Sequence, residues 1–280
     1  MIRILFLISL PLTLCCYQYQ LCIATVFQNE APYLVEWIEY HRARGVQFFR
    51  LYNNNSTDYY QRVLQSYIKN KIVQLIEWPY QYNNLGEYND HVQMKAFNDA
   101  IYFFKEKTKW LALIDVDEFI VPVEEDNIIL FLEKNYPQVS GLAINWQTFG
   151  TSGIERGRVV ADSVFILDSL IKKGDPNAEV NLHCKCIVRP QHVDKVPNPH
   201  FCKYIKNHYA VNTSYERVNG PRSSRVEISK IRINHYWTRD EWFFWNIKVP
   251  RYMRWGINPG SQDHLNLIED RTIQRFLPLF

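Results

Sequence analysis

Short apolar runs alternate with amphipathic stretches through the first part of the chain. Runs rich in β-branched and aromatic residues and bounded by polar turns are typical of buried strands, and they occur at 21–26, 48–52, 72–76 and 110–114. Between them, apolar residues recur at helical spacing in the segments 33–44, 63–68 and 93–105. This alternation predicts an α/β fold with a doubly wound, mostly parallel sheet flanked by helices.

The second half of the chain follows a less regular pattern. Segments 142–146 and 231–236 are strand-like. Three prolines and two histidines within 187–200 predict irregular structure there. Thr238 begins a capped helix rich in aromatic residues, and the residues after Gly256 show no clear pattern.

Composition describes a globular chain and excludes one class of function. Of 280 residues, 47% are hydrophobic and 22% are charged, which is enough apolar surface for a sizeable core. A net charge of +3 without a block of lysines or arginines argues against nucleic-acid binding. Aromatic residues reach 15% of the chain. Their faces suit sugar rings, although aromatic rings serve cores more often.

The first residues have the pattern of a targeting signal. Arg3 supplies one positive charge, and residues 4–14 form an apolar run that is too short to span a bilayer but suits a signal peptide. We therefore expect residues 1–16 to be a signal peptide, which implies the secretory pathway or the cell envelope and proximity to a membrane. If the run belongs instead to a first strand, the protein is cytoplasmic.

Four cysteines follow this segment, Cys22, Cys184, Cys186 and Cys202. Their even number is compatible with disulfides, and a zinc site with Cys202 and a nearby histidine is a further interpretation. No standard metal-ligand spacing is present, so we favour buried thiols.

The strand at 110–114 ends in an acidic segment that contains Asp115, Asp117 and Glu118. The carboxyl ends of parallel strands meet at the edge where open α/β sheets bind ligands. Asp115 and Asp117 point to the same side of an extended chain, and a divalent cation would relieve their repulsion. Such a cation keeps coordination positions for phosphate oxygens. The spacing therefore predicts a metal–diphosphate site, with a solvated acidic turn as the alternative.

Polar residues also follow two earlier strands, at Asn29-Glu30 and at 53–58. Three polar loops at one edge of the sheet favour a nucleotide pocket there.

Six segments then form an ordered pattern. They are Gln28 to Trp37, the 53–58 loop, Asp115 to Ile120, Trp146 with Phe149-Gly150, Lys185 to Pro190, and Asn234 to Trp237. In this order they resemble GT-A glycosyltransferases, and more closely the family-92 glycosyltransferases and their family-2-like relatives. The resemblance covers about residues 21 to 250. The chain departs from it at Asn53-Asn54, where related transferases often carry a carboxylate.

The resemblance implies a GT-A (Rossmann-like) fold with an irregular acceptor lobe. Residues 17–256 would form one domain with a nucleotide-sugar half (17–122) and an acceptor half (123–256), followed by a C-terminal tail (257–280). The implied activity is metal-dependent transfer of a galactose-like hexose from a UDP-sugar to a glycan or glycoconjugate acceptor. The implied cofactor is Mn²⁺ or Mg²⁺, and the implied outcome is inversion of the anomeric centre.

The resemblance also gives individual residues a role. Asp117 is expected to bind the metal directly, with Asp115 closer to the ribose or to a metal-bound water. His235 either completes the coordination or is a buried structural histidine. Trp146 and Phe149 form an acceptor platform, unless one of them packs in the core. The residues expected to contact the nucleoside and phosphates are Thr25, Phe27, Asn29, Glu30, Asn53, Asn54, Asp115 and Lys185.

Inversion requires a general base that accepts the proton of the acceptor hydroxyl. Glu241 is the first candidate because it follows the His235 segment. Glu118 and Glu155 are rivals. Alternatively, Asp240 and Glu241 are first-turn acids favoured by the helix dipole.

Two other classes of function compete with a transferase. A carbohydrate-binding protein on the same fold would keep the aromatic residues but could lose the metal site, whereas Asp115, Asp117 and His235 are all present. A metal-dependent phosphoesterase would need enough histidine and aspartate ligands for two metals, and the sequence has no such cluster.

Overall fold

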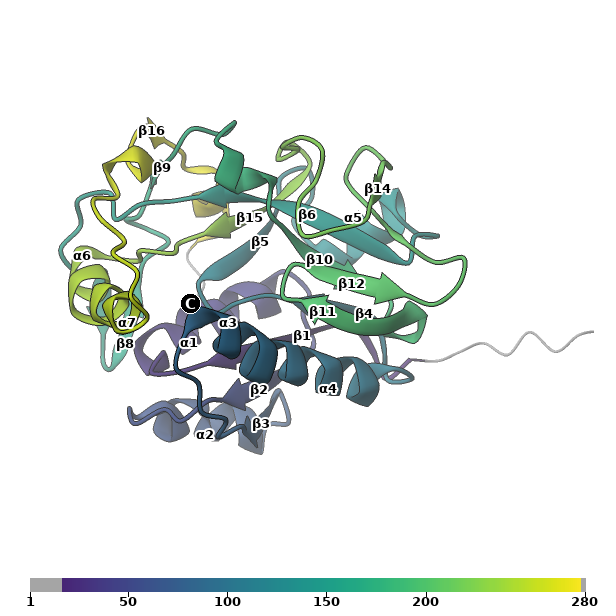
Figure 1. Ribbon diagram of the computed structural model, residues 1–280, viewed down its shortest axis with the longest axis horizontal. Helices are drawn as coiled ribbons and strands as arrows, with labels where there is room; N and C mark the ends of the chain where they lie inside the picture. Colours follow the sequence, from purple (N-terminus) through teal and green to yellow (C-terminus); the bar gives the residue numbers. More distant parts are fainter. Residues whose placement is uncertain (1–16, 278–280) are drawn as a thin grey trace, which may run out of the picture.

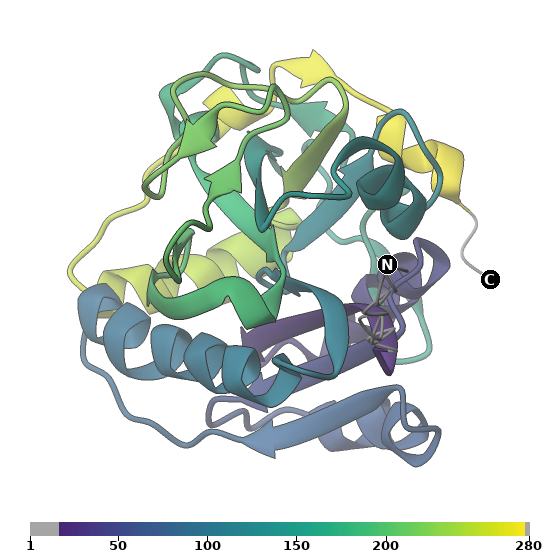
Figure 2. The same cartoon turned by 90° about the vertical axis from the view of Figure 1, so that its right-hand side faces the viewer.

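The computed structural model describes residues 17–277 (Figures 1 and 2). The predicted signal peptide at 1–16 lies outside this range, so the localisation stays a prediction. Within the described range, no helix has the length and apolar character needed to cross a membrane.

The first half of the chain forms a parallel sheet. Its strands are β1 (Tyr19–Phe27), β2 (Phe48–Asn53), β3 (Val73–Glu77) and β4 (Thr108–Leu113). Their order in space is β3-β2-β1-β4, and every pair among them is parallel. The carboxyl ends of β1 and β4 therefore lie side by side, as the sequence pattern predicts for the polar loops.

The second half extends the same sheet beyond β4. Its strands β10 (Cys184–Val188), β6 (Gly141–Thr148), β13 (Ala210–Val211) and β14 (Arg217–Val218) follow in that spatial order. β10 is antiparallel to both of its neighbours, and β13 is parallel to β6. The predicted fold class, a mostly parallel α/β sheet flanked by helices, is confirmed.

A branch of the sheet brings a distant segment to the end of β4. β15 (Ile231–His235) pairs in parallel with β6 and antiparallel with β5 (Glu118–Pro122). In this register His235 is the partner of both Glu118 and Thr148. A histidine more than a hundred positions downstream is thereby fixed beside the acidic segment.

Helices cover both faces of the sheet (Figure 1). One core joins the sheet to α1 (Ala31–Ala43), α2 (Tyr60–Lys69) and α5 (Ile128–Asn135). The opposite core contains α4 (Met94–Phe104) and the hairpin of β11 (Val193–Asn198) and β12 (Phe201–Tyr204). β1 serves both cores, because Leu21 and Ile23 face one and Cys22 and Ala24 face the other, as strand alternation requires.

The remaining elements are short. They are α3 (Leu85–Glu87), α6 (Glu241–Phe243), α7 (Val249–Arg254), β7 (Arg158–Val160), β8 (Ser163–Phe165), β9 (Lys172–Lys173) and β16 (Ile268–Glu269). Two π-helical turns, Tyr88–Gln93 and Phe244–Lys248, run into α4 and α7.

The prediction of irregular structure at 187–200 is wrong. The segment contains the end of β10 and all of β11, whose Val193 and Val196 are buried. Pro197 is tolerated within β11 because the β11–β12 ribbon is a two-stranded pair with register shifts, and proline is accepted at edges and bulges. Pro190 begins a 3-10 turn, and Pro199 lies in the turn between the two strands.

The residues after Gly256 pack onto the domain. β16 pairs with β9, and the side chains of Ile273 and Phe276 are buried in the main core. Asp270 accepts hydrogen bonds from Arg232 (2.9 Å) and Lys173 (2.6 Å). This carboxylate therefore ties the C-terminal segment to β15 and β9.

Replacing Asp270 by asparagine is expected to lower the free energy of unfolding at pH 7 by about 1–3 kcal/mol, because the buried Arg232 and the partly buried Lys173 lose their charged partner. Burial alone would raise the pKa of Asp270, but Arg232 and Lys173 hold it below its ordinary value of 3.8. The contribution is thus present above that value and is lost as the pH falls through the lowered pKa.

Urea unfolding of wild type and Asp270→Asn should therefore show a stability gap that narrows on acidification from about pH 5 to about pH 2. Glu269→Gln, at the neighbouring exposed residue, is the control and should change little. Equal stability of Asp270→Asn and wild type at pH 7 would contradict this role.

Candidate active site

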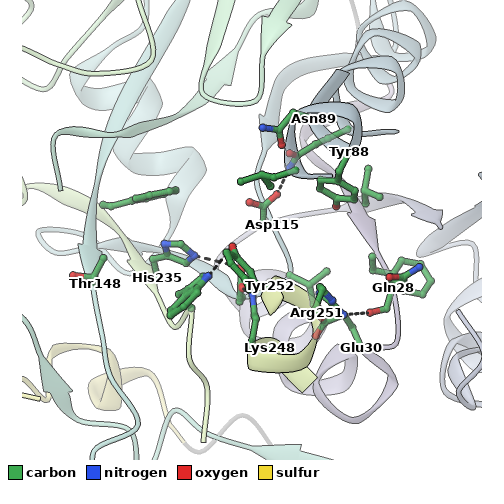
Figure 3. A pocket seen from close by; sticks show the side chains of 18 of the residues that line it. Gln28, Glu30, Tyr88, Asn89, Asp115, Thr148, His235, Lys248, Arg251 and Tyr252 are labelled. Atoms are coloured by element: carbon green, nitrogen blue, oxygen red, sulfur yellow. Dashed lines mark hydrogen bonds and ion pairs between the residues drawn. The ribbon is translucent and has the colours of Figure 1, made fainter. Parts of the chain in front are cut away.

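A cavity of about 500 Å³ opens at the carboxyl ends of β1 and β4. Figure 3 shows Asp115, His235 and Lys248 around its middle, with Gln28 and Tyr88 toward one end and Thr148 toward the other. The cavity therefore lies where the polar loops predict a ligand, between the two halves of the sheet.

A hydrogen-bonded turn holds the acidic segment in place. The backbone N–H of Asp115 donates to Glu118 Oε2 (2.8 Å), and the N–H of Glu118 donates back to the carbonyl of Asp115 (3.1 Å). Glu118 Oε1 accepts from the indole N–H of Trp146 (2.7 Å). Both carboxyl oxygens of Glu118 are thus used to position neighbouring groups.

Lys185 links this turn to β10. Its ammonium lies 2.8 Å from Asp115 Oδ2 and 3.5 Å from Glu118 Oε2 and is buried. Burial raises the pKa of Glu118, while Lys185 opposes that shift. Burial would lower the pKa of Lys185, but Asp115 and Glu118 raise it, so the ammonium stays charged. Lys185 does not line the cavity; it orients Asp115, whose side chain is 30% exposed.

Asp117 lies between a lysine and a histidine. Lys248 donates to its Oδ2 at 2.8 Å, and His235 Nε2 lies 3.6 Å from its Oδ1. Burial alone would raise the pKa of Asp117, but Lys248 and His235 hold it well below the ordinary value. Asp117 is therefore an anion throughout the neutral range.

The donor atoms of Asp117 and His235 fit a divalent cation. A separation of 3.6 Å is too long for a hydrogen bond but suits two ligands of one ion, and His235 Nδ1 has no hydrogen-bond partner among the described residues. Within the described range, no three His, Cys, Asp or Glu side chains are grouped to hold a metal by themselves. A cation here would take its remaining ligands from phosphate and water, as Mg²⁺ commonly does.

The structure places the predicted nucleotide contacts in two groups. Phe27 and Glu30 line the cavity, and Glu30 is held by an ion pair with Arg239 at 2.6 Å. Thr25, Asn29, Asn53, Asn54 and Lys185 do not line it.

The three asparagines do not line the cavity because their side-chain amides hold the loops together. Asn54 is fully buried and donates to the carbonyls of Trp78 and Tyr80. Asn53 donates to Glu77, and Asn29 Oδ1 accepts from the N–H of Thr57. Thr25 is fully buried within β1, where its hydroxyl faces the Val26 carbonyl.

Several cavity residues come from positions that sequence reasoning missed. Lys248, Arg251, Tyr252 and Trp255 belong to the region of α7, and Tyr88 belongs to the first π-helical turn. The Arg251 guanidinium donates to the carbonyl of Gln28 (3.2 Å), which joins α7 to the end of β1. The sequence signal that could have indicated them is the pair Lys248 and Arg251, because two cations three residues apart share a helix face.

The side chains of Trp146 and Phe149 lie in different environments. Trp146 lines the cavity, with its ring 4.3 Å from that of His235. Phe149 is fully buried and packs on Tyr236, so the alternative expected for one of the two residues, packing in the core, holds for Phe149. Thr148, two residues from Trp146 along β6, also lines the cavity, as strand alternation requires.

None of the predicted general bases is free to act in the cavity. Glu118 is fully buried and fully hydrogen-bonded, as described above. Glu241 accepts from the hydroxyl of Thr151 and from Trp245 and does not line the cavity. Glu155 is exposed and also lies outside the lining. The structure thus corrects these three assignments.

The cysteines Cys22, Cys184, Cys186 and Cys202 are buried and unpaired. The prediction of buried thiols is confirmed for these four.

Comparison with known proteins gives one family. The family model described as glycosyltransferase family 92 matches residues 17–274. A glycosyltransferase family 92 protein of Ricinus communis is 28% identical over 230 residues, which are 78% of this chain and 35% of the relative. The chain thus spans about a third of the length of that relative.

One of the more distant relatives is named for an enzymatic activity. A protein of Caenorhabditis elegans named beta-1,4-galactosyltransferase is 22% identical over 69% of this chain and 44% of its own length. Among solved structures, S. aureus TarS in complex with UDP-GlcNAc is 11% identical, with a TM-score of 0.40, over 74% of this chain and 62% of TarS. HddC from Yersinia pseudotuberculosis is 13% identical, with a TM-score of 0.38, over 78% of this chain and 93% of HddC.

Glu118→Gln is expected to lower the free energy of unfolding by about 1–3 kcal/mol. An amide has one acceptor oxygen, so either the Asp115 N–H or the Trp146 indole N–H would lose its acceptor. Urea unfolding measures the change, with Glu155→Gln as an exposed control. Unchanged stability together with lost turnover would contradict the positioning role and favour direct participation of Glu118 in the reaction.

Proposed function

Because the chain belongs to glycosyltransferase family 92, we propose that it transfers a galactose-like hexose from a UDP-sugar to a glycan acceptor with inversion. The observation that carries the proposal is the cluster of Asp117, His235 and Lys248 in the middle of the cavity. The relative named beta-1,4-galactosyltransferase supports galactose as the first sugar to test.

The lining of the cavity supports one orientation of the donor. Gln28, Tyr82 and Tyr88 provide an amide and aromatic faces at one end, which suit a nucleoside. Lys248 and Arg251 place two cations beside the acidic turn, where the diphosphate would lie. Trp146 and Thr148 remain for the acceptor at the other end.

Asp117 and His235 are the residues that would hold a Mn²⁺ or Mg²⁺ ion. When bound, such an ion neutralises the charge that grows on the leaving diphosphate. Asp115, tied to Lys185 and Gln93, presents a carboxylate to the same region. Lys248 lies 2.8 Å from Asp117 and keeps that carboxylate ionised and oriented.

The two ends of the cavity are built from different elements, as a site for two different substrates requires. The nucleoside end is built from β1 and the first π-helical turn, whereas the acceptor end is built from β6 and the segments around His200 and His264. Two substrates can therefore meet at Asp117 from opposite sides, which is the geometry for direct displacement.

Purified protein is expected to release UDP from one nucleotide sugar in a panel when Mn²⁺ and a glycan acceptor are present. A chelator should abolish the release, and Asp117→Ala should lower it by at least about a hundredfold, because one metal-coordinating carboxylate is lost. Glu155→Ala, an exposed acid outside the cavity, is the control. Calorimetric sugar binding without UDP release from any donor would favour a non-catalytic carbohydrate-binding protein instead.

Lys248→Met is expected to lower turnover by about 10²–10³-fold, because removal of one preorganised charge partner of the diphosphate has an effect of that size. Arg254→Met is the matched control, since Arg254 is an exposed cation at the end of α7, outside the cavity. Steady-state kinetics with the preferred donor measures both variants. Similar losses in the two variants would show that general charge, and not the position of Lys248, matters.

A further inference from the structure

The carboxylates in the cavity are all engaged. Glu30, Asp115 and Asp117 are the acids that line it, and each is ion-paired, with Arg239 (2.6 Å), Lys185 (2.8 Å) and Lys248 (2.8 Å) respectively. An inverting transfer still needs a group that accepts a proton from the acceptor hydroxyl. The cavity lining also contains three histidines, His200, His235 and His264.

His200 differs from the other two in how it is held. It lies between β11 and β12, and its Nδ1 is 3.0 Å from the carbonyl oxygen of Cys184. A carbonyl can only accept, so Nδ1 carries the proton and Nε2 has a free lone pair. His264, by contrast, is exposed, and His235 is placed to bind a cation.

Trp146 sets the position of the His200 ring. The two rings meet edge to face with centroids 4.9 Å apart, and Trp146 is itself fixed by its hydrogen bond to Glu118. Trp146 and His200 both line the cavity, so an acceptor hydroxyl bound at this end would lie beside the imidazole.

We propose that His200 is the general base of the reaction, a proposal that rests on the proposed transferase function. Its Nε2 takes the proton of the acceptor hydroxyl as the acceptor oxygen bonds to the anomeric carbon of the donor sugar. The bond from that carbon to the β-phosphate oxygen breaks, and the nucleoside diphosphate leaves with the electron pair. The imidazolium returns its proton to water after the products leave.

The surroundings keep the imidazole neutral before the reaction. Burial and the charge of Lys185 lower the pKa of His200, and His183 and His235 act in the same direction. The imidazole is therefore neutral at physiological pH, and its Nε2 is able to accept a proton.

His200→Ala is expected to lower kcat by about 10²–10⁴-fold, the usual contribution of a general base, with UDP affinity by calorimetry unchanged. Added imidazole should restore part of the turnover. His183→Ala is the matched control, because its ring also packs near Trp146 (5.2 Å) and His200 (5.3 Å) but does not line the cavity. It should stay within a few-fold of wild type.

Three results would overturn the role. They are His200→Ala with near wild-type kcat, parallel losses in UDP affinity and kcat, and no rescue by imidazole in a folded variant. If His200→Ala melts at a lower temperature, His200→Gln replaces it, since glutamine can donate to Cys184 but is not a base at neutral pH. Wild type that releases no UDP from any donor would instead refute the transferase function itself.

Discussion

Three acids within four residues, at the end of a buried strand, are the constraint on which this site depends. Carboxylates removed from water must be paired or hydrogen-bonded, because an isolated buried charge costs several kcal/mol. Asp115, Asp117 and Glu118 meet that requirement through Lys185, Lys248 and a backbone turn. In the resulting network, one carboxylate oxygen of Asp117 faces His235 at 3.6 Å.

The topology of the sheet brings the partners of these three acids to the site. Lys185 comes from β10, which is inserted next to β4, and His235 comes from β15, which pairs with the strand that Glu118 begins. Lys248 comes from a π-helical turn after β15. Both π-helical turns among the described residues contribute cavity residues, in line with the frequent use of such turns at functional sites.

Sequence patterns predict the part of this arrangement that depends on local periodicity. The parallel strands, the helices between them and the acidic strand end all follow from spacing, and the structure has them. Alternation along β6 also separates Trp146 and Thr148, which line the cavity, from Phe149, which packs in the core. The two-residue periodicity of a strand could have predicted this difference from the sequence.

The rest depends on contacts between distant segments. Nothing in the local sequence shows that Asn53 and Asn54 use their amides to join neighbouring loops, or that Glu118 uses both oxygens for positioning. Lys248 meets Asp117 across 131 positions. Such pairings follow from the tertiary fold, because only the fold brings these side chains together and decides which polar groups are left free for a ligand.

The most direct test of this metal–diphosphate site is a crystal structure with Mn²⁺ and UDP, in which the anomalous signal of manganese is measured. If Asp117 and His235 hold the metal, a single peak lies within bonding distance of Asp117 Oδ1 and His235 Nε2, and the diphosphate contacts Lys248 and Arg251. A peak at another place, or a nucleotide bound outside this cavity, would contradict it.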